Sequence, residues 1–234
     1  FPSNIDTLPV VFNCGPTYPE MLRELGESDA FITRDLRVKR ECAARATLIV
    51  SHSRSNIENL TGFMPAYAAK MRCLPFFLPH LKALPEADIV RKFARLDTIQ
   101  CLFVGREARR KALPEVLTAF QELYARFPHL HLKVITNFAD GTVDMPEHPG
   151  IELLGETSRD EVQRLLQQSH MLLVPSHFES YGWIYLEAMA AGCIPVAASG
   201  ATQKEILADG RAGLPVGADA AHLRHAILPY RLHP

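Results

Sequence analysis

Residues 171–198 constrain the fold more than any other part of the chain. They begin with the apolar run Met-Leu-Leu-Val, which predicts a buried strand that a proline ends. A polar loop follows as far as Gly182. From Trp183 the pattern becomes helical until Gly192, which suits the C′ position after a helix. A second apolar run, residues 194–198, predicts another strand. A strand, a loop, a short helix and a strand in this order are typical of a parallel α/β sheet.

Two glutamates on this segment point to a ligand. Glu179 lies in the loop after the first strand, and Glu187 lies inside the helix. Ligands of open α/β sheets bind outside the carboxyl ends of the strands, and a helix N-terminus offers free amide groups to an anion. Amides that bind a phosphate and carboxylates that bind hydroxyls together suit a nucleotide sugar. The structural alternative for both glutamates is an exposed loop or helix carboxylate, the usual fate of this residue type.

The rest of the chain continues the alternation of strands and helices. Pro114 suits the first turn of a helix, and Ser158 with Glu161 forms a capping box. Ser55 is expected to cap a helix that begins near Asn56. Strands alternating with helices of this length predict a doubly wound parallel sheet. The expected strands are residues 8–13, 47–50, 73–78, 99–104, 130–136 and 151–154, with a last one near Val216, and the other expected helices are residues 19–25, 36–46, 114–126, 159–169 and 200–207.

A second cluster of candidate residues follows the strand at residues 99–104. Gly105 and Arg106 stand at its end, and Lys111 comes directly before a helix. Both cations can reach the space above the sheet edge, where a leaving diphosphate needs its charge neutralised. Further arginines lie between them, so the alternatives are a solvated basic turn or a nucleic-acid patch. The glutamates on the same sheet edge favour the phosphate.

The composition limits the class of protein. The formal net charge of the 234-residue chain is −1, so no overall field favours nucleic acid or an anionic membrane surface. No apolar run is long enough to cross a bilayer, and the N-terminus shows no signal-peptide pattern. The cysteines are scattered and odd in number, which predicts reduced thiols in a cytosolic protein without a zinc site. His129 and His131 share one strand face without an evident third ligand, so we expect no metal there.

Two patterns together resemble one enzyme family. Glu179-x7-Glu187 is followed by Ala-Met-Ala-x-Gly-x-Pro-Val, and Gly105-Arg106-x4-Lys111 precedes it in the chain. This combination is similar to the donor site of retaining glycosyltransferases of family four, which have the two-domain GT-B fold. The resemblance implies an α/β chain of the GT-B type with Rossmann-like doubly wound parallel sheets. In the glycine loop that follows, Gln203 stands where the family usually has proline.

The resemblance also implies the domain organisation. Residues 1–80 would form a partial N-terminal Rossmann-like domain on the acceptor side. Residues 81–97 would be a linker with a short helix, and residues 98–234 would form the C-terminal domain that binds the nucleotide sugar. The N-terminal domain is expected to be incomplete, because the family's opening strand and glycine-rich loop find no match in the chain.

The family's site residues carry over to the matching positions. Arg106 and Lys111 would hold the donor's phosphates, and Glu179 would contact the donor sugar near its reacting carbon. The second glutamate would accept hydrogen bonds from the ribose hydroxyls. The catalytic set implied in this way is Glu179, Arg106 and Lys111, and the donor-binding set is Glu187, Ser180, Tyr181, Gly182 and Gly105.

The implied activity is the transfer of a sugar from a nucleoside diphosphate sugar to an acceptor such as a glycan, a lipid or a small molecule. Such an enzyme is hexosyltransferase-like, and it retains the anomeric configuration. No Asp-x-Asp motif occurs, so neither a metal nor another cofactor is expected in the chemistry. We expect a cytoplasmic location and no nucleic-acid partner, with peripheral association at the inner membrane face left open. The alternatives are a non-catalytic nucleotide-sugar-binding module, or pseudoenzyme, and a GT-B epimerase that acts on the nucleotide sugar itself.

Overall fold

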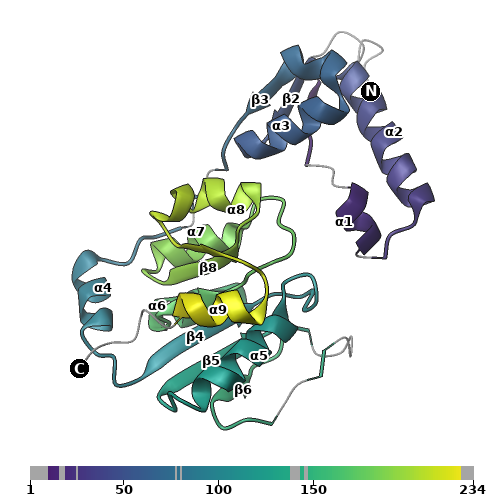
Figure 1. Cartoon of the computed structure of the whole chain (residues 1–234). Coiled ribbons are helices and arrows are strands. Elements are labelled where there is room, and N and C mark those ends of the chain that lie inside the picture. Colours follow the sequence, from purple (N-terminus) through teal and green to yellow (C-terminus); the bar gives the residue numbers. More distant parts are fainter. Residues whose placement is uncertain are drawn as a thin grey trace. The chain divides into compact units, whose positions relative to one another are not determined.

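The chain divides into two compact units, Phe1–Leu78 (unit 1) and Pro79–Pro234 (unit 2). The computed structural model describes residues 10–15, 19–24, 26–76, 78–79, 81–137, 143–144 and 147–227. Each unit combines a parallel sheet with helices and has a hydrophobic core of its own (Figure 1).

Unit 1 contains a three-stranded parallel sheet in the order β1-β2-β3. Its core joins the sheet to its two longer helices through buried side chains such as Ile49 of the middle strand, Ala43 and Leu60. The strands are β1 (Val11–Asn13), β2 (Leu48–Ser51) and β3 (Met71–Cys73), and the helices are α1 (Pro19–Glu24), α2 (Asp29–Arg45), α3 (Arg54–Phe63) and the 3-10 helix η2 (Pro65–Lys70).

Two details of the sequence prediction for unit 1 are wrong. Ser53, not Ser55, caps α3: its backbone is extended, and its Oγ accepts a hydrogen bond of 3.1 Å from the amide of Asn56. The last strand was expected at residues 73–78 but ends at Cys73, shortly before Pro75, which has no amide hydrogen to give to the sheet.

Helix α2 begins well before the predicted residues 36–46. Ser28 caps it, and the Ser28 Oγ accepts a hydrogen bond from the amide of Phe31. In this helix the buried side chains are Ile32 and Ala43, so little apolar periodicity marks its first turns. Residues 8 and 9 of the first predicted strand lie outside the described residues, as does Leu25 at the end of the first predicted helix.

Unit 2 contains a six-stranded parallel sheet in the order β6-β5-β4-β7-β8-β9. Two of its strands are confirmed to the residue, at 99–104 and 194–198. The strands are β4 (Ile99–Val104), β5 (Leu130–Ile135), β6 (Ile151–Leu153), β7 (Met171–Leu173), β8 (Ile194–Ala198) and β9 (Leu214–Val216). The helices are α4 (Glu86–Phe93), α5 (Leu113–Tyr124), α6 (Arg159–Gln168), α7 (Trp183–Ala190), α8 (Ala201–Ile206), the 3-10 helix η4 (Ala208–Gly210) and α9 (Ala220–Ile227).

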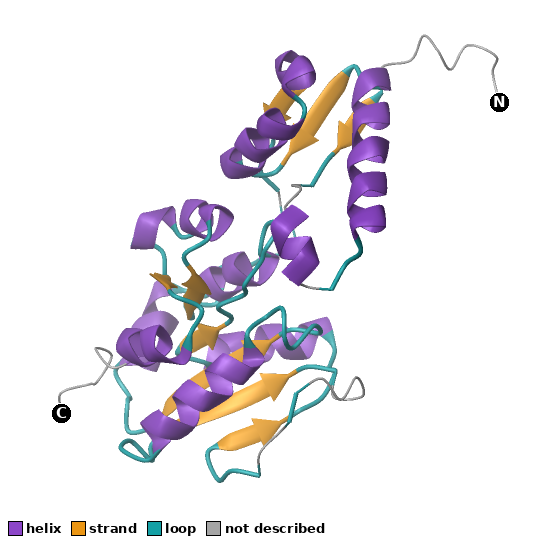
Figure 2. Cartoon of the chain, turned by 45° about the vertical axis from the view of Figure 1, so that its right-hand side comes forward, coloured by secondary structure: helices purple, strands orange, loops and turns teal. Residues whose placement is uncertain are grey.

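The strand order of unit 2 reverses between β4 and β7. From β4 the chain moves outward through β5 to β6, and from β7 it moves in the other direction through β8 to β9. Because parallel crossovers are right-handed, helices of the two halves lie on opposite faces of the sheet. Helix α5 packs beside α9, and α6 packs beside α7, so the sheet is enclosed on both faces (Figure 2). This arrangement is the doubly wound sheet that the sequence predicts.

The core of unit 2 is built from the central strands and the helices that cover them. Phe103, Leu132 and Leu172 of three neighbouring strands are fully buried. Two thiols lie in the same core, and burial raises the pKa of Cys101 and of Cys193 to about 12. The described part of the chain contains no helix long and apolar enough to cross a membrane.

The segment expected as a linker carries helix α4 and belongs to unit 2. The Lys92 Nζ donates hydrogen bonds to the carbonyl oxygens of Ser169 at 2.9 Å and Ala191 at 3.0 Å. Burial lowers the pKa of Lys92. The amide of Leu84 donates to the carbonyl of Ala190 at 2.6 Å. These bonds attach the segment to the ends of α6 and α7.

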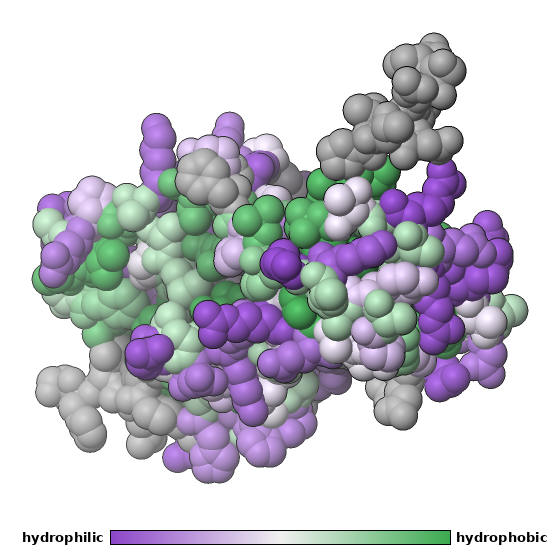
Figure 3. Space-filling model, turned by 90° about the horizontal axis from the view of Figure 1, so that it is seen from above, coloured by the Kyte–Doolittle hydropathy of each residue, from purple (hydrophilic) through white to green (hydrophobic). Residues whose placement is uncertain are grey.

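The surface carries no strong segregation of polar and apolar residues on the face that Figure 3 shows, where hydrophilic and hydrophobic residues are intermixed. Among the described residues, the exposed large hydrophobic side chains come from several separate elements. Examples are Phe31 of α2, Val90 of α4 and Trp183 of α7.

Candidate functional site

The candidate site lies at the carboxyl ends of β4 and β7, where the strand order reverses. The loop after β4 contains Gly105 and Lys111, and the loop after β7 contains Glu179 and Gly182. In open α/β sheets this reversal leaves a crevice between neighbouring loops, and ligands bind there. Both patterns singled out in the sequence therefore meet at one point of the sheet.

Lys111 and Glu179 form an ion pair between these two loops, through the Lys111 Nζ and the Glu179 Oε2. Both side chains are largely buried, with 12% and 10% of their surface exposed. Gly105 makes room for the lysine, because a Cβ atom at this glycine would lie 2.7 Å from the Lys111 Cγ. The pair holds two opposite charges away from water, where their attraction is strong.

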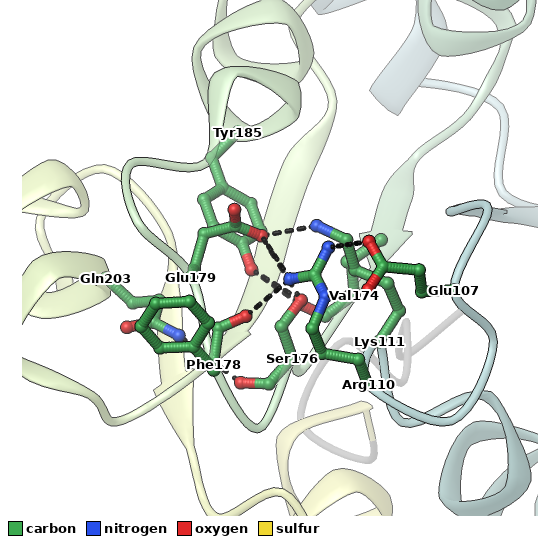
Figure 4. Close-up of polar contacts among 9 residues, drawn as sticks. All are labelled: Glu107, Arg110, Lys111, Val174, Ser176, Phe178, Glu179, Tyr185 and Gln203. Carbon is green, nitrogen blue, oxygen red and sulfur yellow. Dashed lines mark hydrogen bonds and ion pairs between the residues drawn. The ribbon is translucent and has the colours of Figure 1, made fainter. Parts of the chain in front are cut away.

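Arg110 connects the same two loops through several further bonds (Figure 4). Its Nε and Nη2 each donate to the Glu107 carboxylate at 2.8 Å. Its Nη1 donates to the carbonyl oxygen of Phe178 at 2.8 Å and lies 3.9 Å from the Glu179 Oε2. The carbonyl of Arg110 also accepts the amide of His177 at 3.0 Å. The hydrogen bonds from this guanidinium lower the pKa of Glu107.

Arg106 lies apart from this network. Its side chain is 86% exposed, and its Nε is 3.4 Å from the Glu156 Oε1. The spacing of the sequence motif suggested that Arg106 and Lys111 act on the same anion. The structure brings Lys111 and Arg110 to Glu179 and pairs Arg106 with Glu156 on the surface.

Buried hydroxyl and amide groups hold the loop after β7 through hydrogen bonds to its backbone. Tyr185 is fully buried, and its hydroxyl donates to the carbonyl oxygen of Val174 at 2.7 Å. Burial raises the pKa of this phenol. The side-chain amide of Gln203 donates to the carbonyl of Ser176 at 3.3 Å, and the Ser176 Oγ lies 3.5 Å from the Glu179 Oε2. Gln203, which replaces the family's usual proline, thus supports this loop.

Gly182 closes the loop and begins helix α7. Its φ of +88° is a left-handed conformation that glycine adopts without strain. A Cβ here would also lie 2.5 Å from ring atoms of Tyr185 and 3.0 Å from the Glu179 Cγ. Ser180 and Tyr181 precede it, so their backbones and the first amides of α7 lie on the same sheet edge as Lys111. The predicted phosphate-binding backbone is therefore next to the ion pair.

Glu187 lies one turn further along α7 and is nearly buried, with 9% of the residue exposed. Its Oε1 accepts a hydrogen bond of 3.0 Å from the Nη2 of Arg159, the first residue of α6. The Arg159 side chain is 55% exposed. A buried carboxylate with one oxygen on a half-exposed guanidinium can still accept hydrogen bonds from a polyol.

Sequence reasoning missed the roles of Arg110 and Arg159. Arg110 stands in the basic cluster that the motif defines, but its position relative to Glu179, 69 positions later in the chain, follows only from the meeting of β4 and β7. Arg159 directly follows the cap residue of α6, and its partner Glu187 lies on another helix. The described residues contain no group of three or more His, Cys, Asp or Glu side chains that could hold a metal ion.

The fold defines the class to which this protein belongs. A crystal structure of Anabaena Alr3699/HepE in complex with UDP and glucose is similar over 94% of this chain and 61% of that chain, with a TM-score of 0.70 and 18% identity. Sucrose-phosphate synthase from Thermosynechococcus elongatus is similar over 94% of this chain and 57% of that chain, with a TM-score of 0.72 and 19% identity. These likenesses show the GT-B fold.

The chain belongs to the family described as glycosyl transferases group 1, whose model matches residues 98–230. A D-inositol 3-phosphate glycosyltransferase of Nocardioides sp. is 30% identical over 139 residues, which is 50% of this chain and 30% of that protein. A phosphatidyl-myo-inositol mannosyltransferase of Mycolicibacterium smegmatis is 30% identical over 128 residues, 51% of this chain and 32% of that protein. The aligned part of the chain thus spans about a third of the length of these relatives.

Proposed function

We propose that this chain acts as a retaining glycosyltransferase of family four and that unit 2 binds the nucleoside diphosphate sugar. The observation that carries the proposal is the buried Lys111–Glu179 pair at the point where the strand order reverses, beside the N-terminus of α7. Cations and free amides suit a diphosphate, and carboxylates suit sugar hydroxyls. Membership of the glycosyltransferase family supports the same activity.

In this proposal the phosphates bind to Lys111, to Arg106 after it leaves Glu156, and to the backbone amides from Ser180 to Gly182. Gly105 allows the lysine to lie close to the sheet edge. As the bond between sugar and diphosphate breaks, negative charge develops on the leaving oxygen. Preorganised cations and amides stabilise that charge, so no metal ion or other cofactor is needed.

The two glutamates bind the rest of the donor. Glu187 accepts hydrogen bonds from the ribose hydroxyls, and Glu179 orients the sugar near its reacting carbon. The acceptor attacks from the same face that the diphosphate leaves, assisted by the donor phosphate, which retains the configuration of the sugar. The acceptor is a glycan, a lipid or a small molecule, and we propose a cytoplasmic enzyme. The UDP and UDP-glucose complexes of HepE make a uridine nucleotide the first donor to test.

The test is a thermal-shift panel of UDP, GDP, ADP, TDP and CMP, with and without magnesium. A ligand that binds only the native state raises the melting temperature. At a ligand concentration about one hundred times Kd, the free energy of unfolding increases by about 2.7 kcal/mol. We expect one diphosphate to stabilise the protein independently of magnesium. No shift with any nucleotide would contradict the proposal.

Glu187→Ala gives the matching variant, because the Glu187 carboxylate is paired with the half-exposed Arg159 guanidinium rather than with the apolar core. We expect its affinity for the selected nucleotide to fall about tenfold or more, since hydrogen bonds to a charged group contribute about 1.5–3 kcal/mol. Its affinity for inorganic pyrophosphate should stay unchanged in calorimetry. An unchanged nucleotide affinity would remove the ribose assignment.

Product analysis separates transfer from the alternatives. Incubation of the nucleotide sugar with candidate acceptors should yield a glycosylated product. A new sugar isomer formed without an acceptor would indicate an epimerase. Binding without transfer or hydrolysis would indicate a non-catalytic module.

A further inference from the structure

We propose that Arg110 is a positioning residue that keeps the Glu179 carboxylate charged and in place when a nucleoside diphosphate draws Lys111 away from it. This inference rests on the proposed donor site and adds a residue that the motif does not assign. In the free protein the site then rests with Lys111 paired to Glu179, and binding of the donor separates this pair.

The first step is the balance of charge in the free protein. Glu107, Arg110, Lys111 and Glu179 form a connected group of two carboxylates and two cations, with no net charge. A diphosphate that binds Lys111 must compete with Glu179 for it, because the lysine nitrogen is already paired with the carboxylate. Lysine carries a point charge on a flexible stem, so it can turn from one anion to another.

The second step is that Arg110 is held too firmly to follow the ligand. Two of its nitrogens bind both oxygens of Glu107, and the third binds the carbonyl of Phe178. The planar guanidinium fits this set of acceptors, and leaving it would break three hydrogen bonds at once. Its charge therefore stays 3.9 Å from the Glu179 Oε2 after Lys111 has moved.

The third step concerns what else faces Glu179 once Lys111 has left. The Ser176 hydroxyl lies 3.5 Å away and is neutral. The Tyr185 phenol lies below the loop, and burial raises its pKa, so it also stays neutral. Glu107 adds a negative charge behind Arg110. Arg110 is then the cation that remains beside a carboxylate whose side chain is only 10% exposed.

Without Arg110, nucleotide binding should leave this carboxylate poorly compensated in a place shielded from water. A carboxylate in that position takes up a proton rather than remain charged and unpaired. Arg110→Met replaces the guanidinium with an uncharged side chain of similar length. In this variant, binding of a diphosphate should therefore be linked to the uptake of about one proton near neutral pH.

Calorimetry in two buffers with different heats of ionisation, PIPES and Tris, measures this proton uptake. The probe is the diphosphate that the thermal-shift panel selects among UDP, GDP, ADP and TDP, with its nucleoside as a control. The wild type and Arg109→Met should bind the diphosphate with little proton uptake, since Arg109 is an exposed neighbour in the same turn. In Arg110→Met, affinity should fall about tenfold for each pH unit as pH rises, while nucleoside binding keeps its wild-type pH dependence.

Two further variants keep the test decisive. Arg110→Lys retains the positive charge but not the planar guanidinium that binds Glu107 and Phe178 together. This variant should therefore bind the diphosphate without proton uptake, even if the loop is less well held. Glu179→Gln combined with Arg110→Met removes the group that accepts the proton, so the uptake should disappear. If Arg110→Met binds the diphosphate without proton uptake, the role of Arg110 is wrong and the donor site stands. If the wild type binds none of the diphosphates, both the donor site and this inference fail.

Discussion

At the scale of single residues, the site depends on two glycines, which have no side chain and so leave room for neighbouring residues. Gly105 lies under the stem of Lys111, and Gly182 lies against the ring of Tyr185. Each glycine lies directly next to a residue or loop that the proposed chemistry uses. The backbone of Gly182 adds a second requirement, because its φ of +88° is unfavourable for any residue with a Cβ.

Gly182→Ala should therefore disturb the site more than an ordinary surface change. The new Cβ would meet the buried Tyr185 ring, and the left-handed backbone adds about 1–2 kcal/mol of strain. We expect a loss of stability of about 2–4 kcal/mol in urea unfolding, together with weaker diphosphate binding. Gly62→Ala is the control, because a Cβ there meets nothing within 4 Å. Equal effects of the two substitutions would contradict this account.

The two cations of the sequence motif should also differ in importance. Lys111 is 12% exposed and already faces the site, whereas Arg106 is 86% exposed and pairs with Glu156. We expect Lys111→Met to lower diphosphate affinity about tenfold or more, as expected for a charge-assisted bond. Arg106→Met should cost less, because an exposed charge is screened by water and salt.

Titration of UDP against uridine by calorimetry separates the phosphate contribution from that of the nucleoside. Both variants should bind uridine like the wild type. A larger loss of diphosphate affinity in Arg106→Met than in Lys111→Met would show that the exposed arginine, not the buried lysine, is the main phosphate ligand.

The sequence predicts the residues of the motif but not the residues that complete the network. Glu179 and Lys111 carry a signal because each belongs to a recognisable pattern next to a strand end. Arg110 and Arg159 carry none, because the partners that place them in the site, Phe178 for Arg110 and Glu187 for Arg159, lie on other elements and are reached only after folding. A single sequence does not show which of several neighbouring arginines turns toward the site.

At the scale of helices and strands, prediction succeeds where burial is strong. The largely apolar, buried runs of β4 and β8 fix their own limits, and Gly192 ends α7 in the expected left-handed conformation, with a φ of +59°. Prediction is weaker where a helix is mostly exposed. The start of α2 is marked by the cap Ser28 rather than by apolar spacing, and α9 was not predicted.

The cap of α3 gives a test of the corrected assignment. Ser53→Ala removes the oxygen that accepts the amide of Asn56, and loss of such a cap costs about 1 kcal/mol. Ser55 lies in the first turn of the helix, so Ser55→Ala should cost clearly less. Urea unfolding of unit 1, followed by circular dichroism, measures both. A larger loss for Ser55→Ala would favour the cap position expected from the sequence.

At the scale of the whole molecule, the two separate cores predict that the two units unfold as separate cooperative blocks. Unit 2 has the larger core, and the candidate site lies within it. A ligand that binds there should stabilise unit 2 by mass action and leave the unfolding of unit 1 unchanged.

Two optical signals can follow the units separately. The single tryptophan, Trp183, belongs to unit 2, so its fluorescence reports on that unit, while circular dichroism reports on both. We expect UDP to raise the midpoint of the fluorescence transition and to move only part of the dichroism transition. One transition that shifts as a whole in both signals would contradict independent unfolding.

The buried thiols of both units allow the opening of each unit to be measured by chemical labelling. Cys101 and Cys193 lie in the core of unit 2, and Cys14 lies in the core of unit 1, where burial raises its pKa to about 11. Since the thiolate is the reactive form, an alkylating reagent should mark each of these cysteines only when its own unit opens. The exposed Cys73 reacts without any opening, so its labelling rate is the reference rate for an accessible thiol. Mass spectrometry of the labelled peptides would then give the opening rate of each unit from one sample, without any substitution in the chain.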